Sequence, residues 1–209
     1  MKVTIFTLIL LVASVQAQAE NTIELNQPDM DRGLPLMQAL AQRRSVRSWS
    51  EQKLGTQDLS DLLWAAFGVN RPDEGKRTAP TAMNVQDIDI YVFLEEGVYL
   101  YDAFVNTLEP VSDGDYRAEA GIQDFVATAP VTLLLVSDLS NYRGDDDAAK
   151  ERYAAMHAGI ISQNISIFCA GNEMGTVAIG MLDAEVLKER LNIGDNHRVL
   201  LSHPAGYLE

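Results

Sequence analysis

The sequence predicts an α+β fold organised around one long helix that two copies of the chain share. Residues 147–171 are expected to be helical, because Asp147 is a suitable N-cap and Gly171 a suitable terminator. From Ala154 to Ala170 there is no charged residue, and apolar side chains occur all the way round. Such a helix is buried in a large core or at a subunit interface. Elsewhere strands and helices mix without a strict βαβ rhythm, which favours α+β over a doubly wound sheet.

The composition describes one folded domain, or one half of an intertwined dimer. The 209 residues are 47% hydrophobic and 22% charged, as in ordinary globular proteins. The formal net charge of −14 argues against a nucleic-acid partner, because phosphate binding requires a basic surface. Cys169 is the only cysteine, so no internal disulfide can form, and its apolar surroundings suggest a buried hydrophobic residue.

Residues 1–19 have the pattern of a secretory signal peptide. Lys2 precedes a mostly apolar run over residues 3–15, and Ala17 and Ala19 fit a small-x-small cleavage site. We expect cleavage near Ala19 and a secreted or periplasmic protein. The polar residues in the middle of the long helix argue against stable membrane insertion of the mature chain. Residues 20–33 are expected to be a flexible lead-in and residues 34–209 the folded domain.

Several elements are predicted along the chain. A short helix covers residues 34–43, and a second begins at the cap Thr56, has a buried face at 3, 4, 7 spacing and ends at Gly68. Residues 69–79 are expected to form a surface loop. A strand with one strongly apolar face covers residues 88–94 and turns into a hairpin partner at residues 98–101.

The second half is less regular. Short helices are expected at residues 113–120 and 123–129, and the apolar run at 131–136 is typical of a central strand covered on both faces. A β-prone run bounded by glycines follows the long helix at residues 175–180. Asp183 then caps a helix that ends at Leu191, and residues 199–201 form a last strand.

The segment from Arg43 to Trp49 is a candidate anion site. On an extended chain Arg43, Ser45 and Arg47 point the same way, which suits a phosphate monoester. The alternative is that these arginines are solvated charges at the end of a helix, and the segment alone leaves both interpretations open.

Other reactive residue types favour structural roles. The three histidines have no metal-ligand spacing, either among themselves or with a carboxylate, so no metal is expected. His157, within the apolar helix, is interpreted as a core histidine with its hydrogen bonds satisfied. The chain has no Gly-x-Ser-x-Gly elbow and no GxGxxG fingerprint, which argues against a serine hydrolase and a dinucleotide-binding fold.

Five segments stand in the order found in the FMN-dependent nitroreductases, which the chain resembles over residues 36–207. They are Arg43-Arg44-Ser45-x-Arg47, Pro80-Thr81-Ala82-x-Asn84-x-Gln86, the long helix with Ser162-Gln163-Asn164, the run from Gly175 to Gly180, and the closing Pro204-Ala205-Gly206. The short branch that includes the oxidoreductases of thiazole and oxazole peptide maturation is the most similar. Each motif is weak alone, and the shared order makes the combination specific.

The resemblance implies a mostly antiparallel sheet flanked by helices, in an intertwined homodimer with FMN at the subunit interface. It implies that the FMN phosphate, pyrimidine and ribityl side are held by Arg43, Arg44, Ser45 and Arg47. The same flavin would be contacted from the other subunit by Pro80, Thr81, Ala82 and Asn84. Gln123 would be a flavin-contacting amide, and Ile179 and Gly180 would bring backbone amides toward flavin N5.

The implied function is an exported FMN-dependent oxidoreductase that exchanges hydride with a small nitro, quinone or similar substrate by a ping-pong mechanism. No catalytic side chain is assigned, because the flavin supplies the chemistry. Two features depart from the family pattern: no cation follows the last strand, and Ile179 stands where larger nitroreductases often carry an acidic residue. The alternative is a degenerate binding protein of the same fold without redox turnover.

Overall fold

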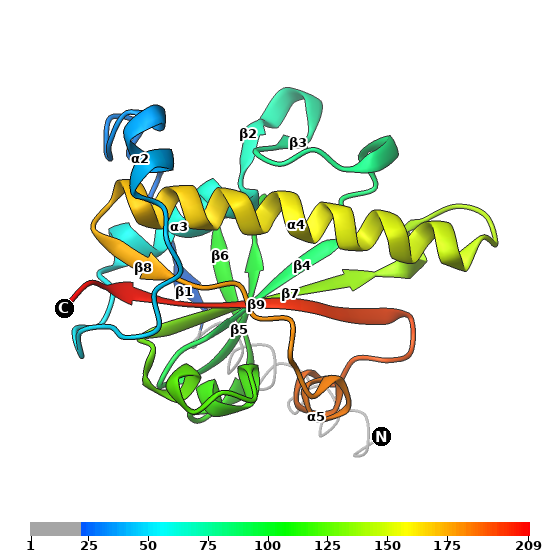
Figure 1. Cartoon of the computed structure of the whole chain (residues 1–209). Helices are drawn as coiled ribbons and strands as arrows, with labels where there is room; N and C mark the ends of the chain where they lie inside the picture. The colour runs from blue at the N-terminus through cyan, green and yellow to red at the C-terminus, as the bar shows by residue number, and fades with distance from the viewer. Residues whose placement is uncertain (1–21) are drawn as a thin grey trace, which may run out of the picture.

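The computed structural model describes residues 22–209, which form a seven-stranded sheet with helices on both faces (Figure 1). The strand order is β1-β6-β5-β4-β7-β9-β8, and every neighbouring pair is antiparallel. In that order the strands are Ile23–Glu24, Thr107–Asp113, Gly97–Asp102, Ile88–Phe93, Val131–Asp138, His197–Tyr207 and Met174–Thr176. The predicted α+β class with a mostly antiparallel sheet is confirmed. The predicted signal peptide lies outside the described residues.

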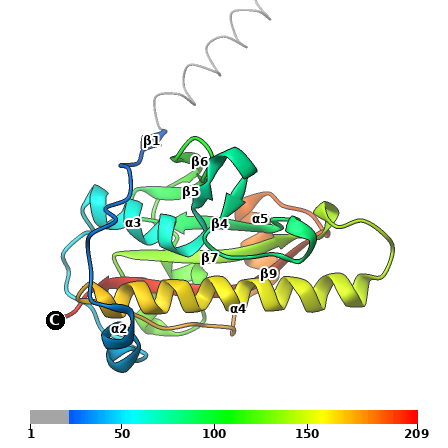
Figure 2. The same cartoon turned by 90° about the horizontal axis from the view of Figure 1, so that it is seen from above.

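The two faces of the sheet are covered by different elements. Helices α3 (Thr56–Phe67) and α4 (Asp147–Gly171) lie on one face, and α5 (Ala184–Leu191) lies on the other (Figures 1 and 2). Alternate residues of β4 divide between them, with Ile90 and Val92 in the core under α3 and α4, and Phe93 in the core on the α5 side. Residues 131–137 of β7 are all buried, as the continuous apolar run predicts.

Helix α4 packs only one of its faces within this chain. The face toward the sheet is buried and consists of Ala154, His157, Ala158, Ile161, Ile165 and Cys169. On the opposite face Met156 is 56% and Ile160 is 38% exposed. One copy alone therefore leaves this face uncovered, and the expected burial of the helix between two copies stays a prediction. Among residues 22–209, no helix combines the length and apolarity needed to cross a membrane.

Two predicted helix caps are off by one residue. The side chain of Asp146, not that of Asp147, accepts a hydrogen bond from the backbone N–H of Ala149 at 3.0 Å. Gly55, not Thr56, is the N-cap of α3. Runs of neighbouring candidates, here Asp145 to Asp147, do not reveal which carboxylate takes the cap position.

The largest error in the predicted elements is strand β6, which the sequence did not suggest. Pro110 argues against a strand, but it lies opposite a register shift in β5 between Val98 and Tyr99. The partner strand β1 pairs only as far as Leu108, so Pro110 also occupies an edge where no N–H is required. The helix expected at 113–120 is reduced to one 3-10 turn, Arg117–Ala120, and that at 123–129 to another, Asp124–Thr128.

Two further segments contain more strand than expected. The predicted loop at 69–79 holds a small hairpin of β2 (Val69–Arg71) and β3 (Lys76–Arg77), with Gly75 at φ +61° between them. Strand β9 continues through Pro204 and Gly206 to pair with β7 and β8, and is longer than the predicted 199–201.

The segment expected to be a flexible lead-in is attached to the body over residues 22–33. Strand β1 pairs with β6, and the Arg32 guanidinium contacts Asp58 and Asp61 at 2.6 Å each. The Asp61 side chain is only 2% exposed. A half-buried cation bound by two carboxylates, one of them buried, fixes this segment against α3.

Candidate functional site

The candidate site begins where residues 43–47 leave helix α2 (Leu36–Gln42) and dock on the edge strand β8. Ser45 forms a parallel bridge with Thr176, and the N–H of Val46 donates to the Thr176 carbonyl at 2.9 Å. Gly175 permits this approach, because a Cβ there would lie 2.5 Å from Val46 Cγ1. The Trp49 indole N–H donates to the Gly175 carbonyl at 2.7 Å. The arginine segment is therefore anchored at both ends of its extended stretch.

Three cations on this segment have no carboxylate partner. Arg43, Arg44 and Arg47 are exposed, and none of them forms an ion pair or a side-chain hydrogen bond within residues 22–209. Within residues 22–209, eight of the other twelve lysine and arginine side chains pair with a carboxylate. Three unpaired guanidiniums within five residues form an anion-binding surface.

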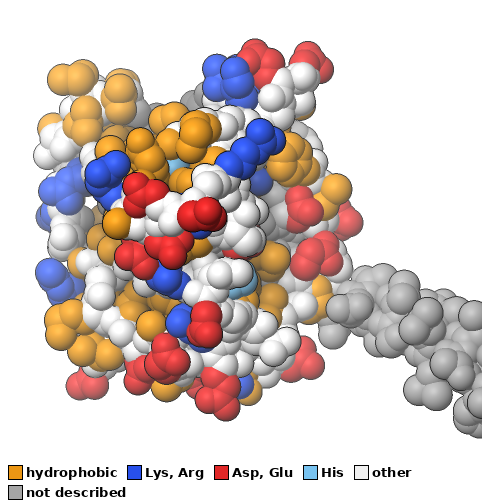
Figure 3. Space-filling model, turned by 90° about the vertical axis from the view of Figure 1, so that its right-hand side faces the viewer, with side chains coloured by type: hydrophobic (Ala, Val, Ile, Leu, Met, Phe, Trp, Pro, Cys, Tyr) orange, Lys and Arg blue, Asp and Glu red, His pale blue; other side chains and the backbone are white. Residues whose placement is uncertain are grey.

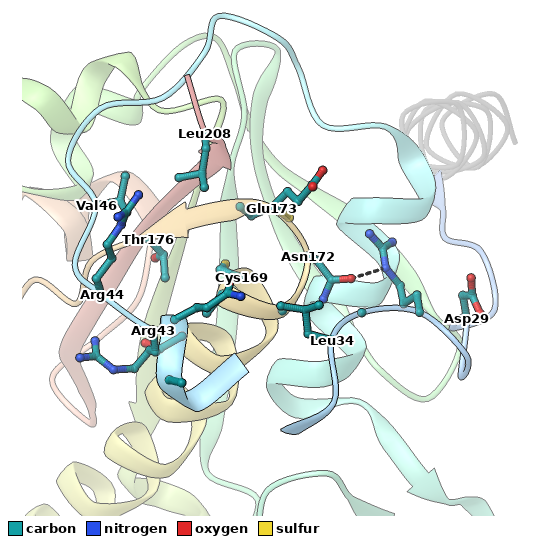
Figure 4. A pocket seen from close by; sticks show the side chains of 18 residues that line it. Asp29, Leu34, Arg43, Arg44, Val46, Cys169, Asn172, Glu173, Thr176 and Leu208 are labelled. Atoms are coloured by element: carbon teal, nitrogen blue, oxygen red, sulfur yellow. Dashed lines mark hydrogen bonds between the residues drawn. The ribbon is translucent and has the colours of Figure 1, made fainter. Parts of the chain in front are cut away.

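Arg43 and Arg44 line an open cavity of about 1150 Å³ (Figure 4). The cavity lies between the segment that begins with α2, the C-terminal half of α4 and strand β8, and its lining also includes Ser166, Cys169 and Thr176. Its volume suits an organic cofactor. Ser45 and Arg47 do not line this cavity, so the expected common face of Arg43, Ser45 and Arg47 is not found there. Side chains alternate along an extended chain, whereas Arg43 still belongs to the end of the helix.

A buried polar chain holds the strand on which the arginine segment docks. The Thr176 hydroxyl donates to the Pro204 carbonyl at 2.9 Å and lies 3.2 Å from His203 Nδ1. His203 Nε2 lies 2.8 Å from the Ser162 hydroxyl of α4. Because the Thr176 proton is committed to Pro204, His203 Nδ1 donates to Thr176 and Nε2 accepts from Ser162. Burial lowers the pKa of His203 to about 4, which keeps this ring neutral.

The run at 175–180 supplies one free backbone donor. Ile179 and Ser202 exchange both backbone hydrogen bonds at 2.9 Å, so the Ile179 N–H is committed to β9. The prediction that both amides of residues 179 and 180 are available is wrong for Ile179. The residue after a fully bonded antiparallel pair points its N–H away from the partner strand. Gly180 is exposed, and its N–H has no partner among the described residues.

Gln123 lies near Ile179, the residue before this free donor. Gln123 Oε1 is buried and has no hydrogen-bond partner within residues 22–209. It lies close to the Ile179 side chain, since a Cβ placed on Gly121 would be 3.4 Å from Gln123 Oε1 and 3.6 Å from Ile179 Cδ1. An unsatisfied buried acceptor is costly unless a ligand completes it. The structure thus brings Gln123, Ile179 and Gly180 together.

The predicted contact segment at residues 80–84 lies elsewhere. The Ala82 N–H donates to His157 Nε2 at 2.8 Å, on the N-terminal half of α4. Ser166 and Cys169, at the cavity, are nine and twelve residues further along the helix, which corresponds to roughly 14–18 Å. Ile179 belongs to the core on the opposite face of the sheet. Within one chain, Pro80, Thr81, Ala82 and Asn84 are therefore not grouped with the other predicted site residues.

Sequence reasoning missed the network behind this segment. Asp87 is fully buried, and its Oδ1 lies 2.6 Å from His157 Nδ1. His157 is a satisfied core histidine, as expected, but its partners were not anticipated. The only available signals were an isolated aspartate at the start of a buried strand and an isolated histidine in an apolar helix.

The chain is similar to known proteins over nearly its whole described length. The family model described as "Nitroreductase family" matches residues 40–207. A Methanocaldococcus jannaschii protein named as a nitroreductase is 28% identical over 191 residues, which are 87% of this chain and 96% of that protein. A solved Ralstonia eutropha structure, also named as a nitroreductase, is 36% identical with a TM-score of 0.85 and covers 90% of each chain.

A more distant structure shows the same fold. The NADPH:FMN oxidoreductase of Vibrio harveyi, solved with NAD+, is 19% identical with a TM-score of 0.63. The match covers 83% of this chain and 69% of that chain.

We predict that His203 makes the folded protein less stable at acidic pH. The unfolded chain takes up a proton at the ordinary histidine pKa of about 6.5, whereas folded His203 takes one up only near pH 4. Its contribution to stability is therefore complete above about pH 6.5 and is lost as the pH falls toward 4. Between pH 7 and 4.5 the free energy of unfolding should fall by about 1–3 kcal/mol more in wild type than in His203→Gln.

Urea unfolding of both proteins across this pH range measures the difference. Asp89, whose pKa is raised to about 6 by burial, titrates with the opposite sign but is present in both proteins and cancels. Parallel pH profiles would show that His203 is not held neutral by the fold.

Proposed function

Because this chain belongs to the nitroreductase family, we propose that it is an FMN-dependent oxidoreductase that works by a ping-pong mechanism. The proposed substrate is a small organic molecule such as a nitro compound or a quinone. The observation that carries the proposal is the docking of residues 43–47 on β8, which places the unpaired Arg43 and Arg44 on the wall of a cofactor-sized cavity, with Arg47 on the same docked segment. A phosphate monoester satisfies such cations with charge-assisted hydrogen bonds.

The chain's residues fit FMN in two sets. The set from one subunit would hold the phosphate, the ribityl chain and one side of the ring system: Arg43, Arg44, Ser45, Arg47, Gln123 and Gly180. The set from the partner subunit would contact the same flavin: Pro80, Thr81, Ala82 and Asn84. In this assignment Ile179 contributes its side chain, because its N–H is engaged with Ser202.

Bound FMN would supply hydride exchange at its N5 atom. The free N–H of Gly180 would donate toward the ring, and the unsatisfied Gln123 Oε1 would accept from a ligand N–H. No side chain is assigned as an acid, base or nucleophile. The protein's contribution is to bind and orient the reactants.

A homodimer built on α4 is part of the proposal. The exposed face of this helix carries Met156 and Ile160, and a Cβ added to Gly159 would meet nothing within 4 Å. A smooth apolar helix face of this kind suits close packing against a second copy. The cavity beside Arg43 and Arg44 adjoins the C-terminal half of α4, whereas Ala82 contacts its N-terminal half, which supports assigning residues 80–84 to the partner.

A flavin-free binding protein of the same fold is the second candidate. Residues 203–209 contain no lysine or arginine, and Asp29 and Glu173 add carboxylates to the cavity lining. Carboxylates near a phosphate weaken its binding. Flavin absorbance in the purified protein, at one FMN per chain, would exclude this candidate.

We predict that each arginine carries a large share of the FMN affinity. Arg43→Ala and Arg47→Ala should each weaken FMN binding by about ten- to a hundredfold, because a charge-assisted hydrogen bond to phosphate is lost. Fluorescence titration of the apoprotein measures this. Lys53→Ala, which removes a positive charge paired with Glu95 and Glu96, is the charge-matched control and should bind as wild type does.

Because riboflavin lacks the phosphate, its binding distinguishes contacts to the phosphate from contacts to the ring system. It should bind poorly to wild type and be little affected by either arginine substitution. If FMN binds equally well to wild type and both variants, the phosphate site lies elsewhere.

We predict that Gly159→Leu disrupts the dimer but not the folded chain. The substitution meets open space within one copy and improves helix propensity by about 1 kcal/mol, but it adds a side chain to the proposed contact. Light scattering after size exclusion should give a smaller mass for this variant. Gly194→Leu, which also meets open space but lies outside α4, should retain the mass of the wild type.

Export is proposed from the signal-peptide pattern of residues 1–19. Mass spectrometry of the protein purified from its natural source should find an N-terminus near Glu20. An intact Met1 in the cytoplasmic fraction would overturn this proposal.

A further inference from the structure

A closed polar network joins helix α4 to the start of β4. Asp87 Oδ1 lies 2.6 Å from His157 Nδ1, and Asp87 Oδ2 accepts from the Ser137 hydroxyl at 2.6 Å. Asp87 and Ser137 are fully buried, and His157 is 3% exposed. The rings of Tyr142 and Tyr153 stack against His157 at centroid distances of 6.3 and 6.2 Å.

The hydrogen bonds determine which nitrogen of His157 carries the proton. The Ala82 backbone N–H can only donate, so His157 Nε2, at 2.8 Å, must be the acceptor. The remaining proton is therefore on Nδ1, where it donates to the Asp87 carboxylate. The Asp87 carboxylate selects this tautomer in the way that carboxylates orient metal-bound and catalytic histidines.

The turn that receives this hydrogen bond has an unfavourable backbone. Met83, Asn84 and Gln86 have φ values of 54°, 55° and 48°, in the left-handed region that side chains rarely adopt. Such a turn persists only where its surroundings fix it. At its far end, Gln86 accepts from Arg77 Nε at 2.8 Å and donates to the Gly75 carbonyl at 2.6 Å. At its near end, His157 accepts from the Ala82 N–H, and within the turn the Thr81 hydroxyl accepts from the Gln86 N–H at 3.0 Å.

We propose that His157 is a positioning residue that holds the strained turn at residues 80–86 in its binding shape. It acts through the Nδ1–H tautomer, which Asp87 selects and which leaves Nε2 free to accept from Ala82. The assignment of the turn as an FMN contact rests on the proposed function, whereas its positioning by His157 does not.

The other titratable groups around the ring must be controlled. Asp87, Tyr142 and Tyr153 face His157 directly. Asp89 lies near Asp87, and burial together with Asp138 raises its pKa to about 6, so the variants are compared at pH 8, above this pKa. A variant that changes only the His157 ring retains all of these groups.

Two variants distinguish the hydrogen bond of His157 with Ala82 from its hydrogen bond with Asp87. Gln at position 157 can extend an amide oxygen to the place of Nε2 and still accept from Ala82. Asn reaches only the place of Nδ1, so it retains the contact with Asp87 and loses Ala82. Amide hydrogen exchange of the FMN-free full-length protein, corrected for intrinsic rates, reads the Ala82 N–H in each case.

At pH 8, His157→Asn should lose about five- to tenfold of the protection of the Ala82 N–H, the loss expected for one hydrogen bond. His157→Gln should remain within about twofold of wild type. Protection of buried β7 amides checks that each variant is folded. Equal loss in both variants, or no loss in either, overturns the proposal.

Wild type alone provides a test that does not require a variant to fold. Nitrogen NMR of the histidine ring at pH 8 should show an unprotonated Nε2 and a protonated Nδ1, and the opposite tautomer would refute the assignment. FMN titration is the separate arm, in which His157→Asn should bind about three- to tenfold more weakly. If wild type binds no FMN, the proposed function fails, and hydrogen exchange still decides the role of His157.

Discussion

The packing of α4 against the sheet is the constraint on which the rest of the molecule depends. Its buried strip lies across β4, β7 and β9 and contributes to the larger core. The same rigid helix presents His157 to the turn at 80–86, Ser162 to His203 and Ser166 to the cavity. Because a helix fixes the spacing of its side chains, these three polar contacts keep constant separations. The apolar packing thus sets the geometry of the polar sites.

Two of the polar contacts of α4 share one design. In each, a histidine is kept in a single tautomer by neighbours that leave no alternative, and its second nitrogen serves an element at the site. His203 supports Thr176, on which the arginine segment docks, and His157 supports Ala82. Burying these histidines is tolerated because each of their ring nitrogens has a hydrogen-bond partner.

The end of the molecule where α4 begins carries acidic and basic side chains among apolar ones, with acidic side chains across its middle (Figure 3).

The parts of the fold that sequence could predict are those with local signals. The uncharged run of α4, the alternation in β4 and the apolar run of β7 each determine a buried face within a few residues. Strand β6 was missed because Pro110 is acceptable only where a bulge and an edge coincide, and both depend on other strands. The pairing of Asp87 with His157 joins residues 70 positions apart, which no local pattern reveals.

For the candidate site, sequence predicted the segments involved but not the detailed contacts of their residues. The residue types at 43–47 and 175–180 indicated an anion site and a close backbone approach, and both segments meet at β8. The commitment of the Ile179 N–H was not predictable, because it follows from the register between residue 179 and β9. Likewise, the departure of Ser45 and Arg47 from the cavity lining depends on how the segment lies against Thr176, and not on the spacing of its arginines.

The strand order also determines which part of the sheet can be completed only after the last strand is available. Strand β9 is the last to emerge from the ribosome, yet it lies between β7 and β8. Until it arrives, the apolar strand β7 has one open edge and β8 has no sheet partner. Thr176 also lacks its His203 and Pro204 contacts, so the platform for residues 43–47 is completed last. A chain cut short before residue 197 would therefore present an unpaired hydrophobic strand, and the quality-control machinery of the cell would treat it as misfolded.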